Sequence, residues 1–147
     1  MKHLLKCMIV VVLCSCGSTV SNMDIATINP VTSNNQVTAE EVLEDFRRDG
    51  FNPQLSGNSS VQWLNTAPGA AYSLGTGWLH IHTYASIDDA TAAAKMIPPT
   101  ADTGQTDWIA DPHFFQCKNI IVLYLGAEDS VLNLLMTRCG LAFASRP

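Results

Sequence analysis

From residue 38 onward, apolar and polar residues first alternate with the period of a helix. Three apolar side chains fall on one face of the predicted helix: Val42, Leu43 and Phe46. Thr38 and Glu41 stand three residues apart, as in a capping box, in which each side chain accepts a hydrogen bond from a free backbone N–H. Gly50 then provides a stop. The pattern predicts a helix over residues 38–49.

Two pairs of apolar runs, each joined by a short turn, predict β-hairpins. The first pair covers residues 70–74 and 78–84 and is joined by a glycine-containing link. The second pair covers residues 114–117 and 120–125. Because the run at 120–125 is apolar on both faces, we expect it at the centre of the sheet.

Two further helices and one short strand complete the predicted elements. A helix over residues 86–97 starts at Ser86, three residues before Asp89, and is ended by two prolines. A third helix over residues 128–139 follows an acidic start and ends at a glycine. A short strand is predicted over residues 61–64.

The order helix, hairpin, helix, hairpin, helix predicts an α+β fold. We expect one domain over residues 38–147, with an antiparallel sheet, one disulfide, and the helices packed on one face of the sheet.

The first fifteen residues have the regions of a secretory signal peptide. A basic start leads into an apolar run from Leu4 to Leu13 that only Lys6 interrupts, and small residues follow. This run is too short to cross a bilayer, which needs about 20 apolar residues. We expect residues 1–15 to be removed, with a short uncleaved anchor as an alternative.

The sequence Leu13-Cys14-Ser15-Cys16-Gly17 resembles the lipobox of bacterial lipoproteins. The resemblance implies cleavage after Ser15 and attachment of acyl chains such as palmitate to Cys16. Lipidation of Cys14 fits less well, because Leu13 would then occupy a position that favours a small side chain. An ordinary cleaved secretion signal is the remaining alternative.

The lipobox resemblance also implies a location and a partner. The chain would be anchored in the cell envelope on the extracytoplasmic side, in the outer membrane or on the outer face of the plasma membrane. Several acyl chains on one cysteine suffice for stable membrane attachment. Residues 16–37 are rich in Ser, Thr and Asn and are expected to form a flexible tether spanning about 25 Å.

A second resemblance covers part of the domain. Residues 111–117, 120–125 and 138–140 are similar to small bacterial lipoproteins and secreted domains of unknown activity. This resemblance implies no reaction and no ligand.

The charge balance argues against nucleic acid as a partner. Removing residues 1–15 removes two of the eight basic side chains and none of the thirteen acidic ones, so the remaining chain has a net charge of −7. The remaining basic residues are scattered along the sequence, whereas phosphate binding requires a basic cluster.

Cys117 and Cys139 follow the lipobox region in a chain predicted to be exported, where disulfides persist. The strand at 120–125 leads away by about 17 Å, and the helix from Asp129 returns by about 15 Å. We therefore expect a structural disulfide, with a redox-active pair as the alternative. A nucleophilic Cys117 with His113 nearby is conceivable, but the disulfide would exclude it.

The strand at 78–84 carries the most suggestive side chains. Its period of two places four of them on one face: Trp78, His80, His82 and Tyr84. This face is a candidate ligand-binding surface. A metal site is the alternative, because His-x-His can reach one ion, and His113 or Asp111 would complete the site. A plain sheet surface, with Leu79 and Ile81 facing the helices, is the third interpretation.

Other side chains have simpler explanations. Four aromatic residues are candidates for a pocket beside this face but are more typical of a core: Trp63, Trp108, Phe114 and Phe115. Two carboxylate pairs stand at predicted helix starts, where capping and the helix dipole explain them: Asp88-Asp89 and Glu128-Asp129.

These observations predict a lipid-anchored envelope module that binds a protein or a small ligand without catalysis and without a cofactor. The sequence has no Gly-x-Ser-x-Gly elbow and no complete dinucleotide or phosphate-binding loop. The competing hypothesis is a metal-dependent hydrolase with His80 and His82 as ligands and His113 as third ligand or base.

Overall fold

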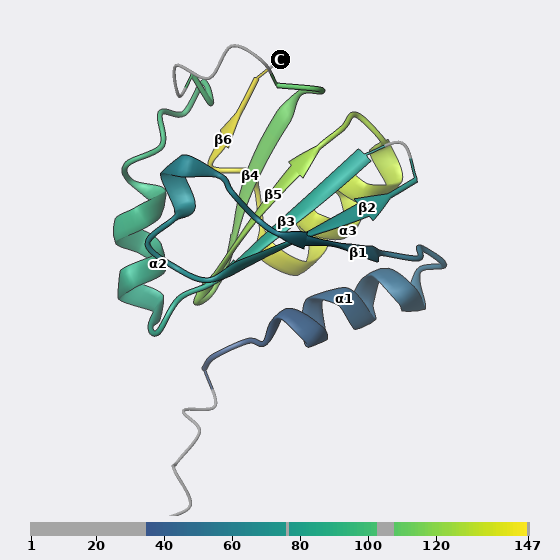
Figure 1. Cartoon of the computed structure of the whole chain (residues 1–147), viewed down its shortest axis with the longest axis horizontal. Helices are drawn as coiled ribbons and strands as arrows, with labels where there is room; N and C mark the ends of the chain where they lie inside the picture. Colours follow the sequence, from purple (N-terminus) through teal and green to yellow (C-terminus); the bar gives the residue numbers. More distant parts are fainter. Residues whose placement is uncertain (1–34, 76, 103–107, 147) are drawn as a thin grey trace, which may run out of the picture. The chain divides into compact units, whose positions relative to one another are not determined.

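The computed structural model describes residues 35–75, 77–102 and 108–146, which form an antiparallel sheet of six strands with three α-helices (Figure 1). The helices are α1 (Ala39–Arg48), α2 (Ile87–Ala94) and α3 (Asp129–Cys139), with a 3-10 helix η1 (Gln62–Leu64). The strands are β1 (Gln54–Asn58), β2 (Gly69–Leu74), β3 (Gly77–Thr83), β4 (Pro112–Cys117), β5 (Ile120–Leu125) and β6 (Ala144–Ser145). The predicted α+β class is therefore confirmed. The predicted signal peptide, Cys16 and residues 17–34 lie outside the described residues.

The helix termini follow the capping chemistry of the sequence. Thr38 and Glu41 form both bonds of the capping box at the start of α1. Ser86 accepts a hydrogen bond from the Asp89 backbone at the start of α2. Gly140, with φ of 87°, ends α3 in a backbone conformation that other residues rarely adopt.

The strand β5 lies inside the sheet, as its composition predicts. The strand order is β1-β2-β3-β5-β4-β6, so β5 pairs with β3 on one side and β4 on the other. All six side chains of β5 are buried. Ile120, Val122 and Tyr124 point to one face of the sheet, and the three residues that alternate with them point to the other.

The two faces of the sheet are covered by different elements, which corrects the expectation that all helices pack on one face. On the first face, side chains of α1 and α3 such as Phe46 and Leu135 bury Val122 and its neighbours. On the second face, Ala90 of α2 and Leu64 of η1 bury Leu123 and its neighbours. Because β5 is apolar on both sides, each side requires a cover. We call these the α1/α3 face and the α2/η1 face.

Three short elements differ from the sequence-based expectation. The predicted strand at 61–64 is wrong, because Gln62–Leu64 form η1. Val61 and Leu64 stand three residues apart and are both buried, which matches the 3-10 period. β1 and β6 were not predicted, because every side chain of β1 is exposed and β6 has only two residues.

A buried asparagine connects the start of α1 to the sheet. The Asn119 side chain accepts a hydrogen bond from Val37 N–H at 2.7 Å and donates one to the Tyr84 carbonyl at 3.3 Å. Asn119 is only 3% exposed and lies in the β4–β5 turn, where Lys118 adopts a φ of 57°. The turn therefore holds the ends of three segments together.

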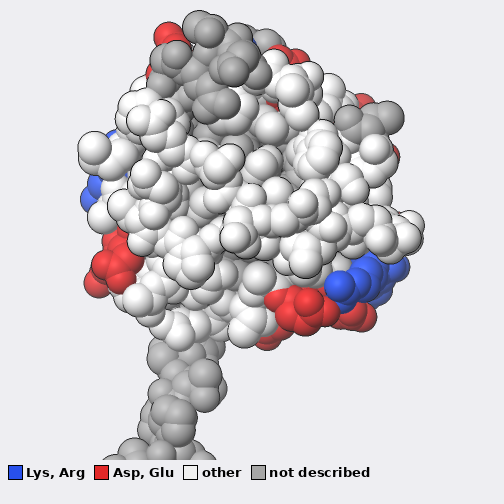
Figure 2. Space-filling model, in the orientation of Figure 1, with Lys and Arg blue, Asp and Glu red and all other residues white. Residues whose placement is uncertain are grey.

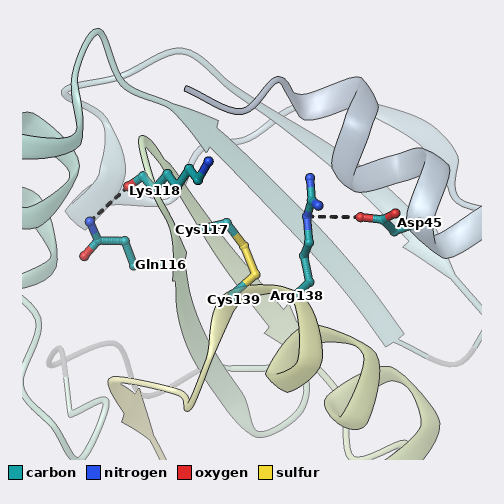
Figure 3. The surroundings of a disulfide bond; sticks show 6 residues. All are labelled: Asp45, Gln116, Cys117, Lys118, Arg138 and Cys139. Atoms are coloured by element: carbon teal, nitrogen blue, oxygen red, sulfur yellow. Dashed lines mark hydrogen bonds and ion pairs between the residues drawn. A yellow bond between two sulfur atoms is a disulfide. The ribbon is translucent and has the colours of Figure 1, made fainter. Parts of the chain in front are cut away.

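The predicted disulfide is confirmed. Cys117 at the end of β4 is bonded to Cys139 at the end of α3, with a Cα–Cα distance of 4.5 Å (Figure 3). Beside it, Arg138 Nε lies 3.0 Å from Asp45 Oδ2, so an ion pair connects α3 to α1. The bond excludes Cys117 as a nucleophile. It also ties the last helix to the central hairpin.

Breaking the disulfide is expected to lower the free energy of unfolding by about 3 kcal/mol, because the closed loop restricts the unfolded chain. The double variant Cys117→Ser/Cys139→Ser should show this loss in urea denaturation. Arg138→Gln keeps the bridge and removes only a part-exposed ion pair, so it should cost less than about 1 kcal/mol. Equal stability of the double variant and the wild type would contradict a structural role.

Candidate functional site

The four side chains predicted to share one face of β3 do so, but they do not form one open surface. His80 pairs with Leu123 and His82 with Ile121, which places both on the α2/η1 face. Trp78 and His80 are half-buried, whereas His82 and Tyr84 are buried. Trp78 and His80 border one hollow and Tyr84 borders another beside α2. His80, which borders the first hollow, and His82, buried two residues further along β3, are therefore the candidate functional residues of this face.

His82 is accommodated by a glycine on the neighbouring strand. Gly69 of β2 is its direct partner, and a Cβ placed on Gly69 would lie 2.5–2.7 Å from three ring atoms of His82. The imidazole therefore packs directly over the Gly69 backbone. On the far side of Gly69, the Ser59 N–H donates to the Gly69 carbonyl at 2.9 Å. Ser59 and His82 thus flank a residue without a side chain.

The Ser59 hydroxyl bridges the two histidines. Its Oγ lies 2.9 Å from His80 Nδ1 and 2.7 Å from His82 Nε2. The other nitrogen of His82, Nδ1, lies 3.3 Å from the Ala67 carbonyl oxygen. Ser59 reaches this position because a bulge between Leu55 and Gly57 shifts the register of β1 against β2.

Both imidazoles are neutral near pH 7. Burial, with a smaller contribution from His82, lowers the pKa of His80 to about 4. Burial also lowers the pKa of His82, and hydrogen bonds to backbone carbonyls offset only part of this effect. Each ring therefore carries one N–H and one lone pair.

Neutral rings allow one consistent direction for these hydrogen bonds. The Ala67 carbonyl can only accept, so His82 Nδ1 donates to it and His82 Nε2 accepts from the Ser59 hydroxyl. Ser59 Oγ then accepts from His80 Nδ1. This arrangement leaves His80 Nε2 with an unshared lone pair. We call it the His80–Ser59–His82 chain.

The three histidines of the metal hypothesis are not brought together. His113 pairs with Tyr124 and stacks on its ring at 6.3 Å, on the α1/α3 face of the sheet. Both nitrogens of His82 already have hydrogen-bond partners. The described residues contain no group of three or more His, Cys, Asp or Glu positioned to hold a metal ion. The predicted ligand set of His80, His82 and His113 is therefore not assembled in the described part of the chain.

A pocket of about 380 Å³ opens beside His80, which we call the indole groove. It is lined by Ser56, Asn58, Ser60, Val61, Ala71, Trp78, His80, Trp108, Ile109 and Leu125. None of these described lining residues carries a charge. Seen from the side of η1, charged side chains lie at the margins of the view, and its middle has none (Figure 2). Clefts of about 300–1,000 Å³ that are lined by apolar and aromatic side chains with a few polar groups are typical of ligand binding.

The aromatic residues outside β3 have different roles. Phe114 and Phe115 are buried in the core, as expected. Trp108 is half-buried in the wall of the indole groove, and its Nε1 has no hydrogen-bond partner in the described part of the chain. Trp63 is 37% exposed on η1 and does not line the groove.

Two residues of the site were not predicted from the sequence. Ser59 lies in a polar stretch without a recognisable pattern, and Gly69 follows a proline as in an ordinary turn. Only the pairing of β1, β2 and β3 brings them next to His82. The sequence distance of Ser59 and Gly69 from the β2–β3 hairpin does not reveal that they contact His82.

Comparison of the chain with protein-family models, curated proteins and solved structures finds no match. Within the described ranges, no helix combines the length and apolar character that membrane crossing requires. The candidate site therefore rests on the geometry of the chain itself.

Gly69→Ala is expected to lower the free energy of unfolding by about 1–3 kcal/mol, because the new methyl group overlaps the His82 ring. The same change in a His82→Ala background should cost much less, since the overlap is removed. Urea denaturation of the four proteins gives the coupling energy. Equal costs in both backgrounds would show that His82 does not pack on Gly69.

Acidification is expected to destabilise the fold between about pH 6.5 and pH 4. Unfolded histidines bind protons near pH 6.5, whereas His80 in the folded state does so only near pH 4. The unfolded chain then binds more protons, so stability falls as pH is lowered through this window. A urea midpoint that falls from pH 7 to pH 4.5, with a shallower fall in His80→Gln/His82→Gln, checks this expectation. An unchanged slope in the variant would refute it.

Proposed function

We propose that this chain is a membrane-anchored, extracytoplasmic lipoprotein whose domain binds a small ligand in the indole groove without catalysing a reaction. The observation that carries the binding proposal is the groove itself, with Trp78, His80 and Trp108 in its walls. Two indoles and a single imidazole acceptor give both contact area and orientation.

The hydrogen bonds of the site favour binding over catalysis. The Ser59 hydroxyl and both His82 nitrogens are already engaged in the His80–Ser59–His82 chain. A reaction at Ser59 or His82 would have to break these hydrogen bonds. The bonds join β3 to Ser59, which precedes η1, and to Ala67, which precedes β2. His80 Nε2 remains to accept a hydrogen bond from a ligand.

The proposed location rests on the lipobox resemblance at Leu13–Gly17. An acylated Cys16 would hold the chain at a membrane surface, and residues 16–37 would separate the domain from the lipid. The disulfide is consistent with an oxidising compartment, because structural disulfides are rare in the cytosol.

Ligand binding is tested by NMR on the chain from Gly17 to Pro147, exported through a conventional signal peptide and screened against a fragment mixture. The three indole N–H signals serve as reporters, because Trp78 and Trp108 line the groove and Trp63 does not. Fragments should shift the first two signals and leave the third unchanged. If no fragment shifts either groove signal, the binding proposal is wrong.

The anchor is tested by metabolic labelling with palmitate in a bacterial host. The wild-type precursor should incorporate label and sediment with membranes, whereas Cys16→Ala should do neither. Cys14→Ala should still be labelled, because Cys16 is the predicted acceptor. Labelling that depends on Cys14 and not on Cys16 would show that Cys14 is the acylated residue, and would refute the assignment of Cys16.

A further inference from the structure

We infer that the indole groove binds a neutral carbohydrate, a glycan segment of one or two sugar rings. This inference rests on the proposed binding function and names its ligand class. The lining chemistry of the groove supports it in three independent ways: its aromatic walls, its uncharged polar groups, and the fixed imidazole of His80.

The aromatic walls provide the apolar half of the contact. Trp78 comes from β3, and Trp108 comes from the segment before β4, so their side chains reach the groove from separate parts of the chain. Sugar rings present a face of C–H groups, which packs against the electron-rich face of an aromatic ring. Ile109 and Val61 extend this apolar surface.

Short polar side chains provide the other half. The side chains of Asn58 and Ser60 line the groove and make no hydrogen bond within the described part of the chain, and Ser56 lies beside them. Amide and hydroxyl groups both donate and accept, as sugar hydroxyls do. A purely apolar ligand would leave these groups and His80 Nε2 without partners, at a cost of about 1–3 kcal/mol per buried group.

Two other ligand classes fit the described groove less well. None of the described lining residues is acidic or basic, so a charged ligand would lose hydration without gaining a counter-charge. An extended peptide would need to pair with the free edge of β1. The bulge between Leu55 and Gly57 interrupts the regular spacing that such an added strand requires.

His80 defines the orientation of the sugar. Ser59 accepts from His80 Nδ1, so Nε2 is left as the acceptor of an imidazole that lines the groove. A sugar hydroxyl donates to such an acceptor, whereas a ligand group that only accepts would be repelled. Ser59 is therefore a positioning residue that acts through His80.

The inference is tested by NMR titration of the unlipidated chain from Gly17 with N-acetylchitotetraose and with cellotetraose, two neutral glycans. We expect at least one to shift the indole signals of Trp78 and Trp108 and to leave that of Trp63 unchanged. Trp78→Ala should weaken binding at least tenfold, and His80→Phe about fivefold, whereas Trp63→Ala should leave binding unchanged. Circular dichroism confirms that each variant is folded.

The role of Ser59 has its own readout. In the wild type, imidazole ¹⁵N shifts should show His80 Nε2 unprotonated, whereas Ser59→Ala should allow both tautomers and weaken glycan binding about threefold. Loss of binding with an unchanged tautomer would refute the positioning role. This measurement separates positioning from a merely structural contribution.

Three outcomes would overturn the inference. If fragments shift the groove signals but neither glycan does, the carbohydrate assignment fails and the binding function stands. If neither fragments nor glycans shift them, both fail. If the groove signals shift on dilution of the protein alone, the occupant is a second copy of the chain.

Discussion

The strand β5 buries all of its side chains, five aliphatic residues and Tyr124, and this constraint determines the architecture around it. Each face has to be removed from water, because burying apolar area is the main source of stability. The α1/α3 face is closed by two helices with large side chains such as Phe46. The α2/η1 face is closed by alanines of α2 and by η1. A sheet covered on one side only would leave three large side chains of β5 in solvent.

The lighter cover on the α2/η1 face creates the site. α2 packs over β4 and β5, so part of this face toward the free edge at β1 is left open, and the indole groove lies there. Gly69, which has no side chain, lies there between Ser59 and His82 across the neighbouring strands. The space is filled by an imidazole, and two histidines become linked through one hydroxyl. A polar chain within an apolar layer is stable because its members satisfy one another.

Much of the fold follows from local sequence signals. The capping residues Thr38 and Ser86, the two hairpins and the cysteine pair act over short stretches, so they can be identified without the tertiary structure. The same sequence also shows that β5 is apolar on both faces, which is incompatible with helices on one face only. By contrast, β1 is exposed throughout and is held by backbone pairing. The contact of Ser59 with His82 depends on its bulge, which no periodicity reveals.

The connection of Val37 to the β4–β5 turn has a mechanical consequence. The chain enters the described fold at Gln36, whose side chain donates to the Ala85 carbonyl, and at Val37, whose backbone N–H donates to the side chain of Asn119, two residues after the bridged Cys117. Tension applied to the preceding chain therefore enters at the end of the two most buried strands. From there the covalent bridge passes it to α3. A pull from the N-terminal side thus acts first on contacts at the β4–β5 turn, next to the bridge, and no residue that lines the indole groove takes part in these contacts.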